Sequence, residues 1–261
     1  RPDGVTVLVN VLRPGGVGIK EASPVGEVVI DAGRSTGVVA LGRKIPCDAV
    51  ILATGGASYP VTGSTGDGYR LAGTAGHQTI PIRPALVPLV TAGNIAGRMA
   101  ELNLRNIKVR MLVNGKKYKE AFGELVFSKF GLTGPVILTL SGYAVDAIQN
   151  GNQVTFAIDL KPALDENKLE ARLLRDFASR GSDDFASFLR GLLPREMVPI
   201  CLELTNIPAD RKVHSISTKE RRRLRAWLKD FRLEVTGFRP FAEAIVTAGG
   251  IDTKEVDPRT M

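Results

Sequence analysis

The sequence predicts the α/β plus β class, with a helical segment inserted into a β-domain. Three observations support this fold class. An apolar run precedes a glycine-rich turn and a short helix, valine-rich strand-like runs fill the first fifty residues, and strand-like segments flank a mostly helical stretch at 162–231.

Length and composition are those of an ordinary globular protein. The 261 residues are 44% hydrophobic and 24% charged, enough for one large domain or two smaller ones. No apolar run approaches the length of a membrane span, and the N-terminal RPDGVTVLVN lacks the features of a signal peptide. We therefore expect a soluble, cytoplasmic protein with no membrane partner, and the oligomeric state is open.

Cysteine and histidine usage argues against a metal site and a disulfide framework. Cys47 and Cys201 lie far apart and outside any CxxC or CxxH pattern. The chain has two histidines, His77 and His214, and no cysteines cluster near them. We expect buried free thiols and no bound metal.

The first fifty residues predict a β-meander. The runs at 5–12, 26–30 and 37–41 are rich in valine and are separated by Gly, Pro, Arg and Asp. The run AVILA at 49–53 is apolar at every position, which is typical of a strand covered on both faces of a parallel sheet. We therefore predict that an α/β unit begins at 49–53.

Glycine-rich backbone follows this run directly. The segment 54–76 predicts a short helix with Ser64 or Thr65 as N-cap and Gly76 as its stop. A strand, a glycine-rich turn and a helix N-terminus favour binding of an anion or a flat cofactor, because backbone N–H groups can approach it closely. The alternative is a set of tight turns that use glycine only for its conformational freedom. No GxGxxG or GxxxxGK[ST] pattern decides between the two.

A hairpin, a helix and a strand are predicted next. Asn114-Gly115 favours a type I′ turn between alternating flanks. The run LTGPVILTLSGYAVDAIQNG predicts a helix with Thr133 near the cap, Pro135 in the first turn and Asn150-Gly151 as its end. VTFAIDL at 154–160 predicts a strand.

Three apolar stripes predict helices across 162–231, and Ser217 with Glu220 predicts a capping box before the third. Strand-like LEVTG and EAIVTAGG follow, so the helices lie between pieces of a β-domain. The stripes are Leu169, Leu173, Leu174 and Phe177; Phe185, Phe188, Leu189 and Leu192; and Leu224, Trp227, Leu228 and Phe231.

Positive charge is concentrated at 211–240. The net charge is +8, and this window holds ten Lys and Arg against three acids. One interpretation is a nucleic-acid-binding surface on the basic helix at 219–229. The apolar residues of this helix form a single stripe, however, and aromatic residues do not alternate with its cations. We therefore favour a solvated face on a docked helix and do not expect a nucleic-acid partner.

Several of these runs together resemble a known family. ILATGGASYPVTGSTGDGY, PALVPL, FSKFGLTGPVILTLS and EAIVTAGGI are similar to the bacterial NAD(P)/FAD-dependent oxidoreductase family that includes aminoacetone oxidases and bile-acid dehydro-intermediate reductases. The resemblance implies part of a Rossmann-like FAD-binding domain with an inserted β-barrel and helical domain. It also implies FAD as cofactor, NAD(P)H as a candidate reductant, and oxidoreduction of a small organic substrate, with the flavin carrying hydride transfer.

The resemblance implies a division of the chain as well. The partial FAD-binding domain would cover 1–83 and 248–261, the barrel-type insert 84–161 and 232–247, and the helical insertion 162–231. The family begins with a GxGxxG segment and ends with an AGE-type segment, and neither occurs in this sequence. We expect an internal fragment that binds FAD weakly or not at all and is inactive alone. The alternative is an inactive substrate or interaction module, or a nucleic-acid-binding module that uses the basic helix.

The resemblance places the cofactor against three short segments. The ATGG end of the apolar run would lie beside the FAD backbone, the TGSTGDG run would face the flavin, and the TAGG run would re-enter the cofactor domain. The catalytic residues stay unknown: His77 is a candidate acid or base, and we favour a capping or packed histidine. The candidate cofactor-binding residues are Thr54, Gly55, Gly56, Ser58, Tyr59, Gly63, Ser64, Thr65, Gly66, Asp67, Gly68, Thr247, Gly249 and Gly250.

Overall fold

The computed structural model describes residues 14–260 and divides the chain into two compact units. Unit 1 comprises Arg1–Gly55, Gly66–Ile80 and Gly250–Met261, and unit 2 comprises Gly56–Thr65 and Pro81–Gly249. The predicted strand at 5–12 lies outside the described residues. The predicted domain boundaries at 83, 161, 231 and 247 stay predictions.

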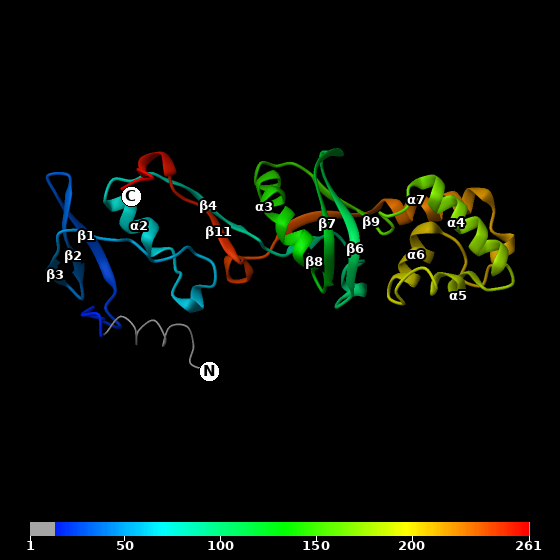
Figure 1. Ribbon diagram of the computed structural model, residues 1–261, viewed down its shortest axis with the longest axis horizontal. Coiled ribbons are helices and arrows are strands. Elements are labelled where there is room, and N and C mark those ends of the chain that lie inside the picture. The colour runs from blue at the N-terminus through cyan, green and yellow to red at the C-terminus, as the bar shows by residue number, and fades with distance from the viewer. Residues whose placement is uncertain (1–13, 261) are drawn as a thin grey trace. The chain divides into compact units, whose positions relative to one another are not determined.

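Unit 1 contains a three-stranded antiparallel meander in the order β1-β2-β3 (Figure 1). Its strands are β1 (Val25–Asp31), β2 (Arg34–Ala40) and β3 (Arg43–Pro46). The strands predicted at 26–30 and 37–41 are confirmed, and β3 was not indicated by the sequence pattern.

The helix α2 (Asp67–Thr74) follows the glycine-rich segment of unit 1. The Arg70 guanidinium donates a hydrogen bond to the Gly26 carbonyl at 2.8 Å, which ties α2 to β1. The helix stops as predicted, with Gly76 in the left-handed region at φ 97°. Its N-cap is Gly66, so the prediction of a Ser64 or Thr65 cap is wrong.

The predicted strand at 49–53 is wrong. These residues have no regular secondary structure, and Ile51 is 88% exposed. No parallel sheet occurs among residues 14–260, so the Rossmann-like part of the predicted fold class is not seen there. A fully apolar strand needs neighbouring strands and a layer on each face, and the described residues supply neither to 49–53.

Unit 2 is built on a closed antiparallel barrel in the order β10-β5-β8-β7-β6-β9, returning to β10. The barrel implied by the resemblance is therefore confirmed. The turn between β6 and β7 holds Asn114 and Gly115 at φ 50° and 77°, as the predicted type I′ turn requires. The strands are β5 (Leu89–Thr91), β6 (Asn103–Val113), β7 (Lys116–Ser128), β8 (Gly131–Thr133), β9 (Val154–Asp159) and β10 (Phe231–Phe238).

The helix α3 (Pro135–Gln149) packs against the barrel beside β7 and β8 (Figure 1). The three-to-four spacing of Ile137, Leu140, Ala144 and Ile148 predicts its buried face. The first three are buried, and Ile148 is half-buried. The helix begins after Gly134 and ends at Asn150, close to the predicted limits.

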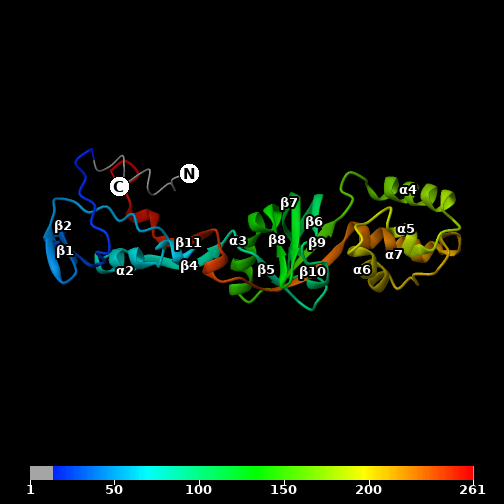
Figure 2. The ribbon, with the colours of Figure 1, turned by 90° about the horizontal axis from the view of Figure 1, so that it is seen from below.

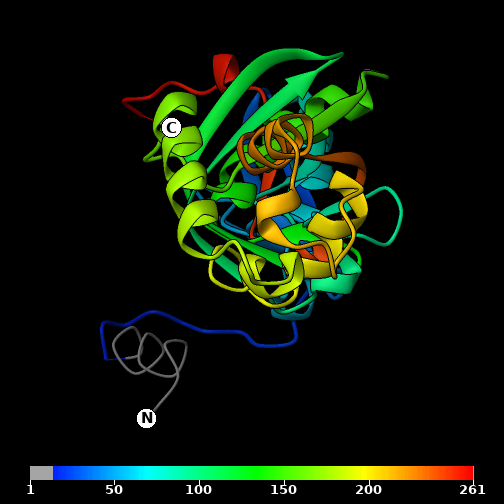
Figure 3. The same ribbon diagram turned by 90° about the vertical axis from the view of Figure 1, so that its right-hand side faces the viewer.

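The helical insertion lies between β9 and β10, and its helices group together in Figure 2 and face the viewer in Figure 3. All three predicted stripes are buried with one exception, because Leu174 is 46% exposed. The capping box of Ser217 and Glu220 is confirmed. The helices are α4 (Glu166–Ser179), α5 (Phe185–Leu189), α6 (Met197–Thr205) and α7 (Thr218–Lys229).

One apolar core runs through the barrel and the helical insertion. Phe127 and Phe156 of the barrel strands belong to the same buried cluster as Phe185 and Phe188 of the insertion. Burying each such ring contributes about 1.5–3 kcal/mol. The insertion and the barrel therefore stabilise each other.

A two-stranded sheet of β4 (Thr79–Ala85) and β11 (Val246–Ile251) completes the strands of the described chain. The strand predicted from EAIVTAGG corresponds to β11. Within residues 14–260 no helix has the length and apolar character needed to cross a bilayer.

Candidate functional site

Within unit 1, residues after the apolar run pack tightly against the start of α2. A Cβ built on Gly68 would lie 2.0 Å from the Oγ1 atom of Thr54. A Cβ on Gly250 would lie 2.9 Å from Cε1 of Tyr69. Three of the predicted cofactor residues, Thr54, Gly68 and Gly250, therefore gather around the first turn of α2, where only glycine permits the approach.

The N-terminus of α2 carries no side-chain cap. Its N-cap Gly66 adopts φ 87° and ψ 5°, and Gly55 is also left-handed at φ 72°. Asp67 lies in the first turn, where a carboxylate favours the helix dipole. The first N–H groups of such a helix are donors for an anionic group, and glycines let that group approach.

Within unit 2, two predicted segments from opposite ends of the chain meet. The backbone N–H of Ala57 donates to Oγ1 of Thr247 at 2.8 Å, and the Ser58 hydroxyl lies 3.0 Å from the same atom. The N–H of Tyr59 donates to the carbonyl of Phe241 at 3.4 Å. The structure therefore brings Ser58 and Thr247 together.

A tight turn continues the segment in unit 2. Tyr59 is left-handed at φ 52°, and the Thr62 hydroxyl donates to its carbonyl at 2.7 Å. Gly63 is left-handed at φ 96°, and a Cβ added to it would meet no atom within 4 Å. The Thr62 hydroxyl is thus engaged inside the turn, whereas Gly63 borders open space.

As contacts of a cofactor, the candidate residues all stay predictions. They divide between the two units. Unit 1 holds Thr54, Gly55, Gly66, Asp67, Gly68 and Gly250, and unit 2 holds Gly56, Ser58, Tyr59, Gly63, Ser64, Thr65, Thr247 and Gly249.

His77 makes a partly exposed contact in unit 1. Its Nδ1 lies 3.0 Å from Oε2 of Glu255, which also accepts the backbone N–H of Gln78 at 3.0 Å. The two side chains are 41% and 32% exposed. This geometry favours a histidine that fixes the chain after α2 over an acid or base in a reaction.

The two cysteines have different surroundings. Cys201 is buried on α6, and burial raises the pKa of its thiol to about 12. Cys47 is only partly buried. The prediction of a buried thiol is therefore confirmed for Cys201 and wrong for Cys47.

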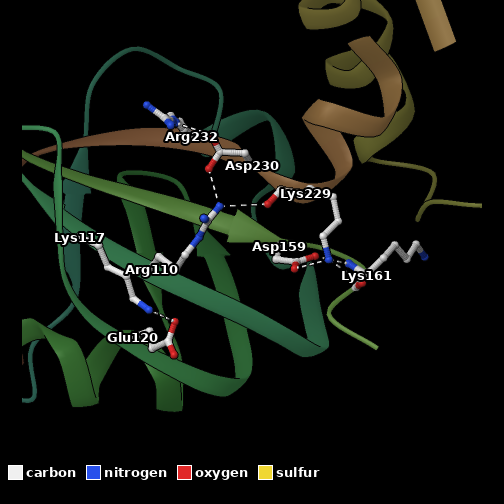
Figure 4. Close-up of polar contacts among 8 residues, drawn as sticks. All are labelled: Arg110, Lys117, Glu120, Asp159, Lys161, Lys229, Asp230 and Arg232. Carbon is white, nitrogen blue, oxygen red and sulfur yellow. Dashed lines mark hydrogen bonds and ion pairs between the residues drawn. The ribbon is translucent and has the colours of Figure 1, made fainter. Parts of the chain in front are cut away.

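A polar cluster lies where the barrel meets α7 (Figure 4). The Lys229 ammonium points to Asp159, with 2.6 Å between Nζ and Oδ2, and also donates to the carbonyls of Lys161 and Leu164 at 3.2 and 2.7 Å. The sequence offered a signal for it that was missed: Asp159 is the one charged residue in the apolar strand VTFAID.

A cavity of about 550 Å³ lies beside this cluster. Its carboxylates all have cationic partners: Lys117 contacts Glu120 at 2.8 Å, Arg110 contacts Asp230 at 2.6 Å, and Asp159 and Glu166 face Lys229 and Arg225. The hydrogen bond from Lys117 is the main reason that the pKa of Glu120 lies below its usual value. Because each of these carboxylates is paired with a cation, the cluster offers no uncommitted carboxylate as an acid or base.

Several cations of α7 face acids of their own unit. Arg221 lies 2.7 Å from Glu170, and Arg225 lies 3.2 Å from the same carboxylate. Arg221 is the main cause that holds the pKa of Glu170 below its ordinary range. Among the described residues, Lys219 and Arg222 have no carboxylate within 4 Å. Carboxylates from elsewhere in the chain therefore offset much of the positive charge that the 211–240 window carries in the sequence.

Comparison with known protein families identifies the family to which most of unit 2 corresponds. Residues 83–246 match the family model described as "HI0933-like protein barrel and H2TH domain". The chain belongs to this family. The match covers the barrel strands and the helical insertion of the HI0933-like chain.

Three curated relatives are similar over most of the HI0933-like chain, and all are enzymes. The 3-dehydro-bile acid delta(4,6)-reductase of Clostridium scindens is 27% identical over 220 residues, 84% of this chain and 54% of the relative. The ribosomal RNA dihydrouridine synthase of Escherichia coli is 30% identical over 98% of this chain and 61% of the relative. That of Haemophilus influenzae is 28% identical over 82% and 50%. The chain thus spans between half and about three fifths of the length of these relatives.

Proposed function

We propose that the HI0933-like chain is part of a flavin-dependent reductase that saturates a carbon–carbon double bond conjugated with a carbonyl. The observation that carries this proposal is the glycine-rich segment. Gly55, Gly63 and Gly66 are all left-handed, and the helix that follows has no side-chain cap. Glycine-rich backbone at the start of a helix suits the pyrophosphate of a dinucleotide cofactor, because no side chain holds the anion away and the helix dipole favours negative charge.

The activities of the relatives support the reaction class. A delta(4,6)-reductase and a dihydrouridine synthase are both named for forming a saturated carbon–carbon bond. When a double bond is conjugated with a carbonyl, a hydride adds to the β-carbon and a proton to the α-carbon. FAD, when bound, supplies the hydride, and NAD(P)H is the reductant that we propose for restoring it.

The chain's own residues would bind and orient. In unit 1, the backbone at Gly66 and Asp67 would donate to the anionic part of FAD. In unit 2, Ser58 and Thr247 are already hydrogen-bonded to one another, so we assign them the role of fixing the backbone around Ala57. We expect their substitution to loosen this segment more than to remove a direct contact.

We favour uracil within RNA as the substrate over a free small molecule. The favouring observation is the 30% identity to the Escherichia coli ribosomal RNA dihydrouridine synthase over 98% of this chain. The expectation of no nucleic-acid partner was drawn from the basic helix alone. A conjugated small molecule, as in the bile-acid reductase, is the competing substrate class.

A flavin titration tests the proposal. The purified 261-residue chain is examined for flavin absorbance and then titrated with FAD while flavin fluorescence is recorded. The test variant is Gly63→Ala and the matched control is Gly115→Ala, because both glycines have positive φ and open space where a Cβ would be added. We expect weak saturable quenching by this chain, which Gly63→Ala reduces further and Gly115→Ala leaves unchanged. Absence of quenching in the chain and in a version extended to the length of its relatives would contradict the proposal.

A further inference from the structure

The β6–β7 hairpin presents exposed aromatic rings among lysines. Tyr118 of β7 is 55% exposed and Tyr143 of α3 is 42% exposed. Phe122 is also exposed, but it lies on the opposite face of β7 from Lys119, because the two residues are three apart in a continuous register with β6. The rings of Tyr118 and Tyr143 meet edge to face with 6.1 Å between centroids, and Lys119 Nζ lies 4.9 Å from the Tyr143 ring. We call Lys116, Tyr118, Lys119 and Tyr143 the hairpin surface.

The hairpin surface carries uncommitted positive charge. Residues 103–128 include six Lys and Arg and two Glu. Glu120 contacts Lys117 and Lys108, and Glu124 lies 3.7 Å from Arg105. Lys116 and Lys119 have no carboxylate within 4 Å anywhere in residues 14–260, and they flank Tyr118.

The basic helix α7 lacks this combination. Its aromatic residue Trp227 is 8% exposed, and Arg221, Arg225 and Lys229 are held by carboxylates of unit 2. Phosphate binding there would have to break ion pairs that stabilise the fold. The hairpin surface therefore fits a polyanion with stacking groups better than α7 does.

We propose that the hairpin surface binds a single-stranded segment of RNA. Bases stack on Tyr118 and Tyr143, and the backbone phosphates lie beside Lys116 and Lys119. Stacking on aromatic side chains combined with a cationic track is the physical basis of sequence-tolerant single-strand binding. This inference rests on the proposed function, because the bound strand would belong to the RNA whose uracil is reduced.

Fluorescence anisotropy of a labelled oligouridylate with the 261-residue chain tests the inference at several salt concentrations. Tyr118→Ala and Tyr143→Ala are each expected to weaken binding about tenfold. The double variant Lys116→Ala/Lys119→Ala is expected to lower the slope of log affinity against log salt by about 1.4, since each phosphate contact on a single strand contributes about 0.7. The matched control Lys219→Ala/Arg222→Ala removes two exposed cations from α7 and should change neither quantity.

Three results would overturn the inference. They are no oligouridylate binding by the parent chain at low salt, hairpin variants that bind like the parent, and a larger loss in the α7 control than in the hairpin variants. Light scattering adds a fourth: a dimer that dissociates in Tyr118→Ala while RNA affinity is unchanged would assign the surface to a second copy of the chain. Thermal melts confirm that each variant is folded, which is expected because the substituted side chains are exposed.

The flavin titration keeps the two proposals separate. Ring-dependent RNA binding by a protein that never binds flavin supports the hairpin surface and removes the reductase. Flavin binding with an RNA affinity that does not depend on Tyr118 and Tyr143 supports the reductase and overturns the hairpin surface.

Discussion

Lys229 and Asp159 form a largely buried ion pair, with Nζ and Oδ2 2.6 Å apart and the side chains 18% and 11% exposed. The lysine uses its remaining donors on the carbonyls of Lys161 and Leu164, and the other carboxylate oxygen of Asp159 accepts the N–H of Lys161 at 2.9 Å. Every strong hydrogen-bonding group of the pair is therefore satisfied. The contact joins the last residue of β9 to the last residue of α7.

Lys229→Met should be strongly destabilising, because it leaves the Asp159 carboxylate and two carbonyls without their partner. We expect a loss of about 3–5 kcal/mol in the free energy of unfolding, measured by urea denaturation. Arg232→Ala is the control, since Arg232 pairs with Asp230 while 59% exposed, and its loss should stay below about 1 kcal/mol. Equal losses of unfolding free energy in the two variants would show that the buried ion pair contributes no more to stability than the exposed one.

Glu170→Gln should destabilise the chain in a pH-dependent way. Arg221 and then Arg225 hold the pKa of this carboxyl below the usual 4.5. Because the pKa is lower in the folded state, the stabilisation is present above the ordinary pKa and is lost as the pH falls through the folded value. Urea unfolding should show a loss of about 1 kcal/mol at pH 7 and a much smaller one at pH 3. Glu196→Gln, at an exposed position, should show no such difference, and a constant effect of Glu170→Gln would argue against the charge pairing.

Cys201 should resist alkylation in the folded protein. Burial raises its thiol pKa to about 12, so almost no thiolate exists at mildly alkaline pH, and the thiolate is the reactive form. Iodoacetamide near pH 8 followed by peptide mass spectrometry should label Cys47, which is partly exposed, and leave Cys201 unmodified until the protein unfolds. Labelling of both at similar rates in the native state would contradict this burial.

Two identical substitutions should have opposite effects on stability. A Cβ at Gly131 would lie 2.2 Å from the Leu89 carbonyl oxygen and 2.8 Å from the Thr91 nitrogen, so Gly131→Ala forces β5 and β8 apart. We expect a loss on the order of 3 kcal/mol or more. Gly142 lies inside α3 with its nearest neighbour at 3.9 Å, so Gly142→Ala should stabilise by about 0.5–1 kcal/mol. Thermal unfolding of the two variants tests the pair, and a stable Gly131→Ala protein would mean that the barrel seam is looser than described.

Short sequence patterns correctly predicted the turns, caps and helices that depend on interactions between residues close in the sequence. Asn114-Gly115 indicated its turn because both positions need positive φ. Ser217 with Glu220 indicated the start of α7 because each side chain accepts a hydrogen bond from the backbone N–H of the other residue. Apolar spacing identified the buried faces of α3, α4 and α7. Among these positions Leu174 is the exception, lying at the edge of its stripe, where periodicity alone does not decide exposure.

Longer-range features lay beyond the sequence pattern. The run 49–53 was predicted as a strand from its composition. A strand also needs neighbouring strands to pair with, and the residues of the run do not reveal whether such neighbours exist. The basic window looked uncompensated because its acids, such as Glu170 and Asp159, lie far upstream. In the candidate cofactor site, the approach of Ser58 to Thr247 joins segments that no local pattern relates.

The pairing of β9 with β10 has a consequence for biosynthesis. Ile158 pairs with Phe231, so the two strands that close the barrel are separated by the whole of 160–230. During translation β5 to β9 leave the ribosome well before β10, and the intervening helices, which depend on local contacts, have time to form first. Until β10 arrives, β9 and β5 are exposed strand edges. We therefore expect slow closure of the barrel. The partly formed sheet would be vulnerable to aggregation through its exposed strand edges, and the helices that form early would be the first elements to cover it.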